Sequence, residues 1–229
     1  MLIINSNDEA LSYLKRQPGA DTLLYVPMET DLLDHSGNNV SITNYWISLN
    51  TTVLQSMGVW YFKGGSEDRL EFSGIPFWTN TFTISRWEKT SSSSNGTGTR
   101  FSSAWNWGNN WAWLLIGYQW TDLYVWNWGA TWNIISGAKA TNSTTNTWVH
   151  WTIVREGNAR KTYKNKTLYW SGNASGSIWY NTEVIGNYRP WDKNPYYGYM
   201  SQFIIEKKAR SQADISEYHD KIKDKFWLS

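Results

Sequence analysis

The chain has 229 residues, of which 17% are aromatic and 17% are charged, with a formal net charge of +2 and no cysteine. This content of strand-forming rings excludes a disordered chain, the balanced charge predicts no binding to nucleic acid, and the lack of thiols excludes disulfides and thiolate metal sites. The length suits one all-β domain, so we expect an N-terminal arm over residues 1–20 and a single domain over residues 21–229.

The first residues predict a short helix over residues 7–16. Ser6 and Glu9 have the spacing of a capping box, and Pro18 ends the run. The opening lacks the basic segment and the apolar run of a signal peptide, and no stretch reaches the roughly 18 apolar residues of a membrane span. We therefore expect no export signal and no membrane insertion.

The residues beyond Asp21 predict short strands joined by turns. Apolar or alternating runs are separated by links rich in Gly, Pro, Ser and Asn, with no helices between them, which favours two antiparallel sheets. We expect strands over residues 23–28, 40–49, 58–62, 70–72, 81–87, 111–118, 123–128, 148–155, 161–169, 183–186 and 199–206. The period changes at the end, where Ser211 and Asp214 cap an amphipathic helix over residues 212–225.

The densest feature is the stretch over residues 104–132, which holds eight of the chain's 18 tryptophans. A polar break at residues 119–122 divides it into a hairpin with strands over residues 111–118 and 123–128. Antiparallel pairing with a fixed register then predicts the following partners: Tyr118 with Leu123, Ile116 with Val125, Leu115 with Trp126, and Trp113 with Trp128.

The two faces of this hairpin differ in character. One is mainly aliphatic and carries Ala112, Leu114, Ile116, Tyr118, Leu123 and Val125. The other is mainly aromatic and carries Trp111, Trp113, Leu115, Tyr124, Trp126 and Trp128. The aliphatic face is the better candidate for the core between two sheets, and the aromatic face then needs a partner.

Several segments, in chain order, resemble the laminin-G-like branch of the concanavalin A-like lectin/glucanase superfamily. They are LLYVPMETDLLDHSGNN (residues 23–39), VWYFKGGSEDRLEF (59–72), TFTISRWEK (81–89), TWVHWTIVREGNARKTYKNKTL (147–168), EVIGNY (183–188) and YYGYMSQFIIEKKARSQADISEYHD (196–220). The resemblance implies an all-β, two-sheet antiparallel jelly-roll sandwich. The chain departs from the family pattern at Lys166, where Gly is usual after Asn165, and in its high tryptophan content.

The same resemblance raises catalysis and calcium binding as alternatives. Family glucanases use an E-x-D-x-x-E strand, and this chain has Glu29, Asp31 and Asp34 in E-x-D-x-x-D order. The final Asp and the D-x-S-G turn favour a solvated strand end with an Asx turn at Asp34, so no catalytic residue is expected. Some relatives bind calcium, for which Asp34 and Asp192 would be the loop carboxylates; no other cofactor is expected.

The three histidines lie far apart in the sequence, at His35, His150 and His219. No zinc site or catalytic triad is therefore expected. His150 is predicted to be a hydrogen-bonded, half-buried ring.

The aromatic stretch is the remaining candidate site. Flat indole rings stack on the apolar face of a pyranose while nearby polar side chains bind its hydroxyls. The residues expected to bind carbohydrate or to form an interface are Trp105, Trp107, Trp111, Trp113, Tyr124, Trp126, Asn127 and Trp128. The alternative is burial, because large apolar patches on monomers are usually interfaces.

The sequence thus predicts a non-catalytic recognition module that binds glycans on a phage virion, as a capsid decoration or a tail-associated protein. One alternative is a purely structural virion protein whose tryptophans form a subunit interface, and another is a glycoside hydrolase. The expected partners are a glycan or a neighbouring virion protein, with homo-oligomerisation as a further option. The expected location is the virion surface or the outside of the cell.

Overall fold

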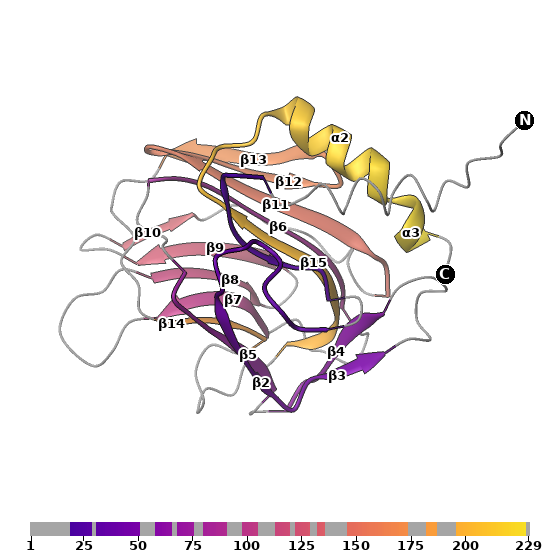
Figure 1. The fold of residues 1–229 in the computed structure, drawn as a ribbon. Coiled ribbons are helices and arrows are strands. Elements are labelled where there is room, and N and C mark those ends of the chain that lie inside the picture. Colours follow the sequence, from indigo (N-terminus) through magenta and orange to yellow (C-terminus); the bar gives the residue numbers. More distant parts are fainter. Residues whose placement is uncertain are drawn as a thin grey trace, which may run out of the picture.

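The computed structural model describes residues 19–28, 31–50, 58–65, 68–75, 80–90, 98–104, 113–119, 122–128, 132–135, 146–173, 182–186 and 196–227. These residues form two antiparallel sheets and two C-terminal helices (Figure 1). The predicted all-β sandwich is thereby confirmed. The helix predicted over residues 7–16 lies outside the described residues.

Sheet A contains eight strands of the described chain. In order they are β13 (Thr167–Asn173), β12 (Ala159–Lys164), β11 (Val149–Glu156), β6 (Thr81–Thr90), β15 (Tyr197–Glu206), β4 (Val59–Lys63) and β3 (Ser48–Asn50), with β1 (Thr22–Val26) also paired to β15. Strand β4 pairs with the first residues of β15 and β1 with its last, so both lie along one edge of it. Strands far apart in the sequence are therefore neighbours in this sheet.

Sheet B contains seven strands of the described chain. In order they are β10 (Trp132–Ile135), β9 (Asp122–Trp128), β8 (Trp113–Gln119), β7 (Gly98–Ala104), β14 (Thr182–Ile185), β5 (Arg69–Ser73) and β2 (Ser41–Tyr45). The sequence pattern does not reveal β7 or β10. Strand β7 begins inside a segment rich in Ser, Gly and Thr, and the four residues of β10 are too few to show a clear period.

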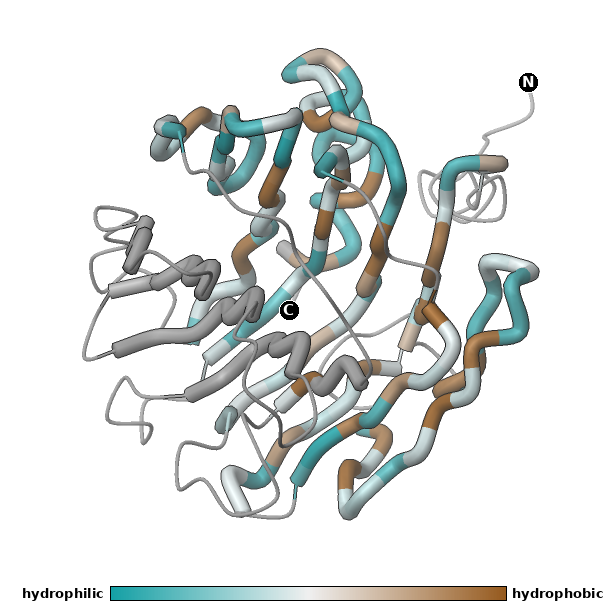
Figure 2. The backbone as a smooth tube through the Cα atoms, turned by 90° about the vertical axis from the view of Figure 1, so that its left-hand side faces the viewer, coloured by the Kyte–Doolittle hydropathy of each residue, from teal (hydrophilic) through white to brown (hydrophobic). Residues whose placement is uncertain are grey.

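Apolar side chains from both sheets fill the space between them. Phe72 of β5 and Phe203 of β15 stack across it with their ring centroids 6.3 Å apart. Leu24, Phe62 and Ile185 are fully buried in the same cluster. Figure 2 shows hydrophobic positions recurring between polar ones along these strands, as expected for strands with one face in a core. Each such side chain contributes about 1.5–3 kcal/mol on burial, so this core is the main source of stability.

Helices α2 (Gln212–Ile222) and α3 (Asp224–Trp227) lie on the outer face of sheet A (Figure 1). Ser211 and Asp214 form the predicted capping box. In place of one continuous helix to residue 225, the chain turns at Lys223 and a second helix begins. This turn brings the ring of Phe226 onto that of Trp87, with centroids 4.2 Å apart. Neither of these two described helices is long and apolar enough to cross a membrane.

Two segments predicted as single strands each divide at a turn. Residues 161–169 divide between β12 and β13 at Asn165 and Lys166, whose φ angles of 46° and 66° fit a type I′ turn. Residues 40–49 divide between β2 and β3 at Trp46, which has a φ of 63°. Neither turn has Gly or Pro at these positions, so Asn165 is the only usual turn residue among the three.

Candidate functional site

The tryptophan-rich hairpin has the predicted register. Strands β8 and β9 pair Trp113 with Trp128, Leu115 with Trp126, Ile116 with Val125 and Tyr118 with Leu123. Gln119 and Asp122 also pair, so two residues connect the strands where four were expected. Three of the predicted site residues lie outside the described residues, namely Trp105, Trp107 and Trp111.

The inner face of sheet B is defined by β5 and β14. Leu70, Phe72 and Ile185 are fully buried in the core between the sheets. Glu71 lies between Leu70 and Phe72 in β5 and is partly exposed, so its side chain belongs to the outer face. Because β14 pairs Ile185 with Leu70 and Val184 with Glu71, Val184 belongs to the outer face as well.

The register continues this outer face across the sheet to the tryptophans. Val184 pairs with Ser102 of β7, and Ser102 pairs with Leu115 of β8. Leu115 in turn pairs with Trp126 of β9. Residues directly paired across a sheet share a face, so Leu115 and Trp126 lie on the same outer face as Glu71. This agrees with the expectation that the aliphatic face of the hairpin is the inner one.

Strand β10 adds two residues to this outer face. Trp132 pairs with Trp128, and Ile134 pairs with Trp126. Since Trp128 also pairs with Trp113, one row of tryptophans, at positions 113, 128 and 132, crosses three adjacent strands. We call these three residues the tryptophan row. Neighbouring strands lie about 4.8 Å apart, so the row spans about 10 Å. Trp132 is absent from the predicted site because the sequence pattern does not reveal β10.

Tyr124 and Asn127 fall on opposite faces of the sheet. Tyr124 pairs with Gly117 and shares the outer face with the tryptophan row. Asn127 pairs with Leu114 on one side and Asn133 on the other, which assigns it to the inner face. The register thus separates Asn127 from the aromatic residues beside which it was expected to bind sugar hydroxyls.

The outer face is polar at the opposite end of sheet B. The guanidinium carbon of Arg69 lies 3.8 Å from the ring centroid of Tyr45, and Arg69 Nε donates a hydrogen bond to Glu71 Oε1 at 2.6 Å. Thr43 and Ser73 are exposed on the same face. Both helices of the described chain pack on sheet A, so no described helix covers this face of sheet B.

Asp34 is a structural residue of the turn after β1. Its Oδ1 accepts hydrogen bonds from the N–H groups of Tyr25 (3.2 Å) and Ser36 (2.9 Å). Its Oδ2 accepts hydrogen bonds from the N–H of Val40 (3.0 Å) and the hydroxyl of Ser36 (2.8 Å). Both oxygens are thus engaged by the turn, in agreement with the predicted Asx turn. No group of three His or acidic side chains in the described ranges could hold a metal ion, and Asp192 lies outside those ranges.

The E-x-D-x-x-D segment includes one residue, Glu29, that lies outside the described residues. Asp31 Oδ1 accepts a hydrogen bond from the N–H of Leu33 (3.0 Å) and lies 3.0 Å from Nε2 of His35. Partial burial acts to raise the pKa of Asp31, but the interactions with His35 and Leu33 outweigh it and lower the pKa. The general acid of a glycosidase needs a raised pKa, so Asp31 does not fit that role.

A buried histidine lies beneath α2. His150 Nε2 is 2.7 Å from Ser85 Oγ and 3.2 Å from Thr152 Oγ1, and the imidazole stacks on Trp87 with centroids 5.0 Å apart. The predicted hydrogen bonding is confirmed, but the ring is fully buried because the helix covers it. Burial lowers the pKa of His150 well below its usual value. Ser85 and His150 are each 1% exposed, so this Ser–His pair offers no access to a substrate.

Comparison with protein families matches residues 63–216 to the family described as the concanavalin A-like lectin/glucanases superfamily. This range is more than half of the 229 residues and runs from the last residue of β4 through β15 into α2. A search of curated proteins found no match.

Solved structures with the same fold include one carbohydrate complex that matches over its whole length. This is domain 4 of AbnA, a GH43 extracellular arabinanase from Geobacillus stearothermophilus, in complex with arabinotriose. It is 18% identical to this chain with a TM-score of 0.71, and the match covers 88% of this chain and 100% of that domain.

Two neurotoxin structures match in part. The receptor binding domain of botulinum neurotoxin D is 19% identical, with a TM-score of 0.71 and coverage of 87% of this chain and 52% of that one. The serotype D ligand binding domain in complex with N-acetylneuraminic acid is also 19% identical, with a TM-score of 0.67 and coverage of 87% and 50%. This chain therefore spans about half of the neurotoxin chains, and at these identities the likeness shows a shared fold.

Proposed function

We propose, from the premise that the chain belongs to the concanavalin A-like lectin/glucanase superfamily, that it is a non-catalytic module that binds glycans. The binding surface in this proposal is the outer face of sheet B, with the tryptophan row at its centre. The observation that carries the proposal is the series of strand pairings, from β5 through β14, β7 and β8 to β9, by which Leu115, Trp126 and Trp128 share the face of Glu71.

A row of indoles suits a saccharide for physical reasons. Each ring presents a flat apolar surface to the C–H groups of a sugar, and Trp loses little conformational entropy when it binds because it has only two side-chain torsions. Three neighbouring strands supply such residues within about 10 Å, a span that accommodates more than one sugar unit. Tyr124 adds a ring with a hydroxyl on the same face.

The ligand class is supported by the arabinanase domain, which matches over its full length and whose structure contains arabinotriose. The neurotoxin complex with N-acetylneuraminic acid gives weaker support, because half of that chain lies outside the match. The proposal includes no catalysis: the turn engages both oxygens of Asp34, and the lowered pKa of Asp31 does not suit the general acid of a glycosidase.

Titration of the protein with a panel of neutral oligosaccharides, starting with arabinotriose, tests the proposal through tryptophan fluorescence. We expect a saturable change for the wild-type chain and an affinity at least about tenfold lower for Trp128→Ala, since the central ring of the row is lost. Tyr169→Ala removes an aromatic side chain that is 37% exposed on β13 of sheet A, away from the tryptophan row, so this control should bind as tightly as the wild-type chain.

A flat response of the folded protein across the whole panel would overturn the proposal. So would a Trp128→Ala variant that keeps its affinity for sugar but converts an oligomer into monomers in light scattering, since the face would then be a subunit interface. The virion location stays a prediction from the sequence.

A further inference from the structure

The outer face of sheet A is covered by the C-terminal helices over only part of its extent. Phe226 of α3 stacks on Trp87, and Val59 of β4 is buried in the same cluster. Two residues farther along β4, Tyr61 lies on the same face, paired with Tyr199 of β15. Tyr199 packs against the edge of the helix cluster, so the face continues beyond the helices.

Three tyrosine rings meet on this part of the face. Tyr61 stacks on Tyr199 with centroids 4.9 Å apart and an interplanar angle of 30°, and Tyr197 meets Tyr61 edge-on at 6.0 Å and 64°. All three side chains are half-buried. We call these three residues the tyrosine platform. Since β4 and β15 are far apart in the chain, no local sequence pattern reveals the platform.

The surrounding backbone holds the platform in place. Gly64 follows β4 with a φ of +79°, and a Cβ atom there would lie 3.0 Å from Cδ2 of Tyr197, so a larger residue would displace the ring. Asp68 Oδ2 accepts a hydrogen bond from the N–H of Lys63 at 2.8 Å, which fixes the same loop. Burial is the main cause, and hydrogen bonding to Tyr197 the next, of a pKa of Tyr61 above its ordinary value.

Two lysines flank the platform on the same face. Lys89 pairs with Tyr199, and Lys63 pairs with Tyr197. Lys63 is exposed and Lys89 is half-buried. The carboxylate of Asp68, which acts on Tyr61 electrostatically, is only 4% exposed and is engaged by backbone N–H groups. The described side chains around the platform therefore favour a ligand with negative charge.

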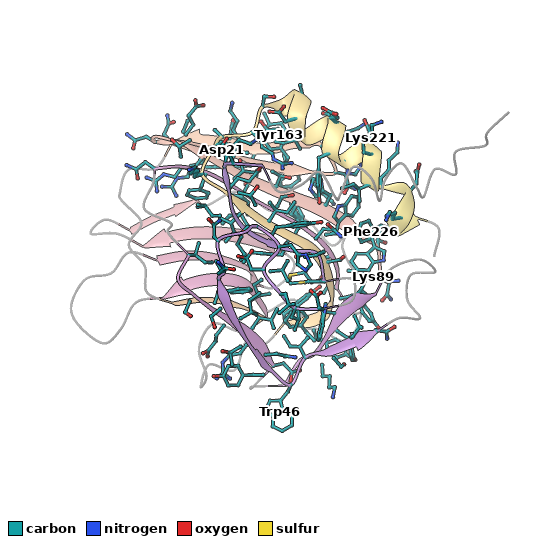
Figure 3. All side chains as sticks on the ribbon, in the orientation of Figure 1. Asp21, Trp46, Lys89, Tyr163, Lys221 and Phe226 are labelled. Atoms are coloured by element: carbon teal, nitrogen blue, oxygen red, sulfur yellow. The ribbon has the colours of Figure 1, made fainter. Side chains whose placement is uncertain are left out.

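Trp46 lies at the same end of sheet A. It precedes β3, whose Ser48 pairs with Tyr61, and Figure 3 shows its ring pointing away from the rest of the molecule. The backbone of Trp46 is left-handed, which costs a residue other than glycine about 1–2 kcal/mol. The side chain of Asn44 holds the turn at Trp46, because its Nδ2 donates to the C=O of Ile47 and its Oδ1 accepts from the N–H of Ile47, both at 3.1 Å.

We propose that the tyrosine platform, together with Lys63 and Lys89, binds a saccharide that carries a carboxylate, and that Trp46 borders this second site. The tyrosine rings pack against the C–H face of the sugar, their hydroxyls bond to its hydroxyls, and the lysines pair with its carboxylate. The inference shares its ligand class with the proposed function but uses a different surface, so either can fail alone.

Calorimetric titration with N-acetylneuraminic acid and with trigalacturonic acid tests the inference and separates the two sources of a sugar carboxylate. We expect the wild-type chain to bind at least one of them, and less tightly at high salt because the contact is charged. Affinity should fall at least about tenfold in Tyr199→Ala and in the double variant Lys63→Gln/Lys89→Gln. Trp128→Ala should leave it unchanged.

Tyr169→Ala is the matched control, because that tyrosine is 37% exposed on β13, away from the platform, and its loss should not change the affinity. If circular dichroism shows that Tyr199→Ala is unfolded, the double lysine variant decides alone. The inference is overturned if the folded wild-type chain binds neither acid. It is also overturned if binding survives the double lysine variant, or if Trp128→Ala removes it.

Discussion

At the scale of single residues, two positions show what sequence spacing leaves open. Asp34 fits both an Asx turn and a calcium site, because both need a carboxylate in a loop, and only its four hydrogen bonds identify it as a turn residue. Lys166 stands where the family pattern has Gly, and its φ of 66° shows that the chain keeps the type I′ turn without that residue.

Asp34→Ala should lower the free energy of unfolding by about 2–4 kcal/mol, because it removes several charge-assisted hydrogen bonds and leaves their donors unsatisfied. Urea denaturation of the two proteins measures the difference, and Asp34→Asn should lose less because it keeps one acceptor oxygen. Millimolar calcium should leave both midpoints unchanged. A wild-type midpoint that rises with calcium, and does not rise in Asp34→Ala, would show that this carboxylate is a ligand after all.

Lys166→Gly should stabilise the protein by about 0.5–1 kcal/mol. Glycine adopts a positive φ without the roughly 1–2 kcal/mol cost that lysine incurs, whereas the exposed ion pair lost with Asp220, at 2.7 Å, contributes only about 0–1 kcal/mol. Asp220→Asn breaks the same pair, together with the 3.4 Å pair to Lys223, without changing the backbone, and should be neutral or slightly destabilising. Thermal melts compare the three proteins, and a Lys166→Gly variant less stable than Asp220→Asn would refute this explanation.

At the scale of elements, sequence patterns among neighbouring residues predict helices and strand register, whereas features that depend on residues distant in the chain are not predicted. The capping box at Ser211 and the alternation on both sides of the hairpin turn predict α2 and the β8–β9 register, because each depends on residues close in the chain. The turns at Trp46 and Lys166 lack Gly and Pro, and the packing of α3 on Trp87 depends on distant residues. Those features become visible only in the folded chain.

The contact between the helices and sheet A should weaken in mild acid. Burial lowers the pKa of His219 to about 4 against the opposing effect of Asp220, and its imidazole stacks on Trp87 at 5.2 Å. Between the ordinary pKa of 6.5 and about 4, the unfolded chain binds a proton that the folded chain does not, so stability falls as the pH falls through this window. His150, with a pKa lowered well below 6.5, extends the loss to lower pH.

Melting temperatures measured from pH 7 to pH 4.5 test this expectation. The wild-type chain should lose at least about 3 °C, and His219→Gln should show a flatter dependence on pH because the residue no longer titrates. An unchanged slope in His219→Gln would exclude this histidine as the cause.

At the scale of the whole molecule, the two sheets differ in what lies on their outer faces. Sheet A carries the C-terminal helices, and the tyrosine platform begins where they end, whereas sheet B carries the tryptophan row with no described helix over it. The family resemblance predicts the sandwich, and local alternation predicts Trp113, Trp126 and Trp128 as one face. The place of Trp132 in the tryptophan row and the tyrosine platform could not be predicted, because they depend on the pairing of β10 with β9 and of β4 with β15, which no sequence pattern indicates.

The most direct test of the proposed glycan-binding surface is a nuclear magnetic resonance titration of the tryptophan indole N–H signals with the oligosaccharide from the panel that binds most tightly. The signals of Trp113, Trp128 and Trp132 should shift together and saturate with one dissociation constant, while those of the buried Trp87 and Trp151 stay in place. Shifts that leave the tryptophan row unaffected while the sugar binds elsewhere would contradict the assignment of the outer face of sheet B as the glycan-binding surface.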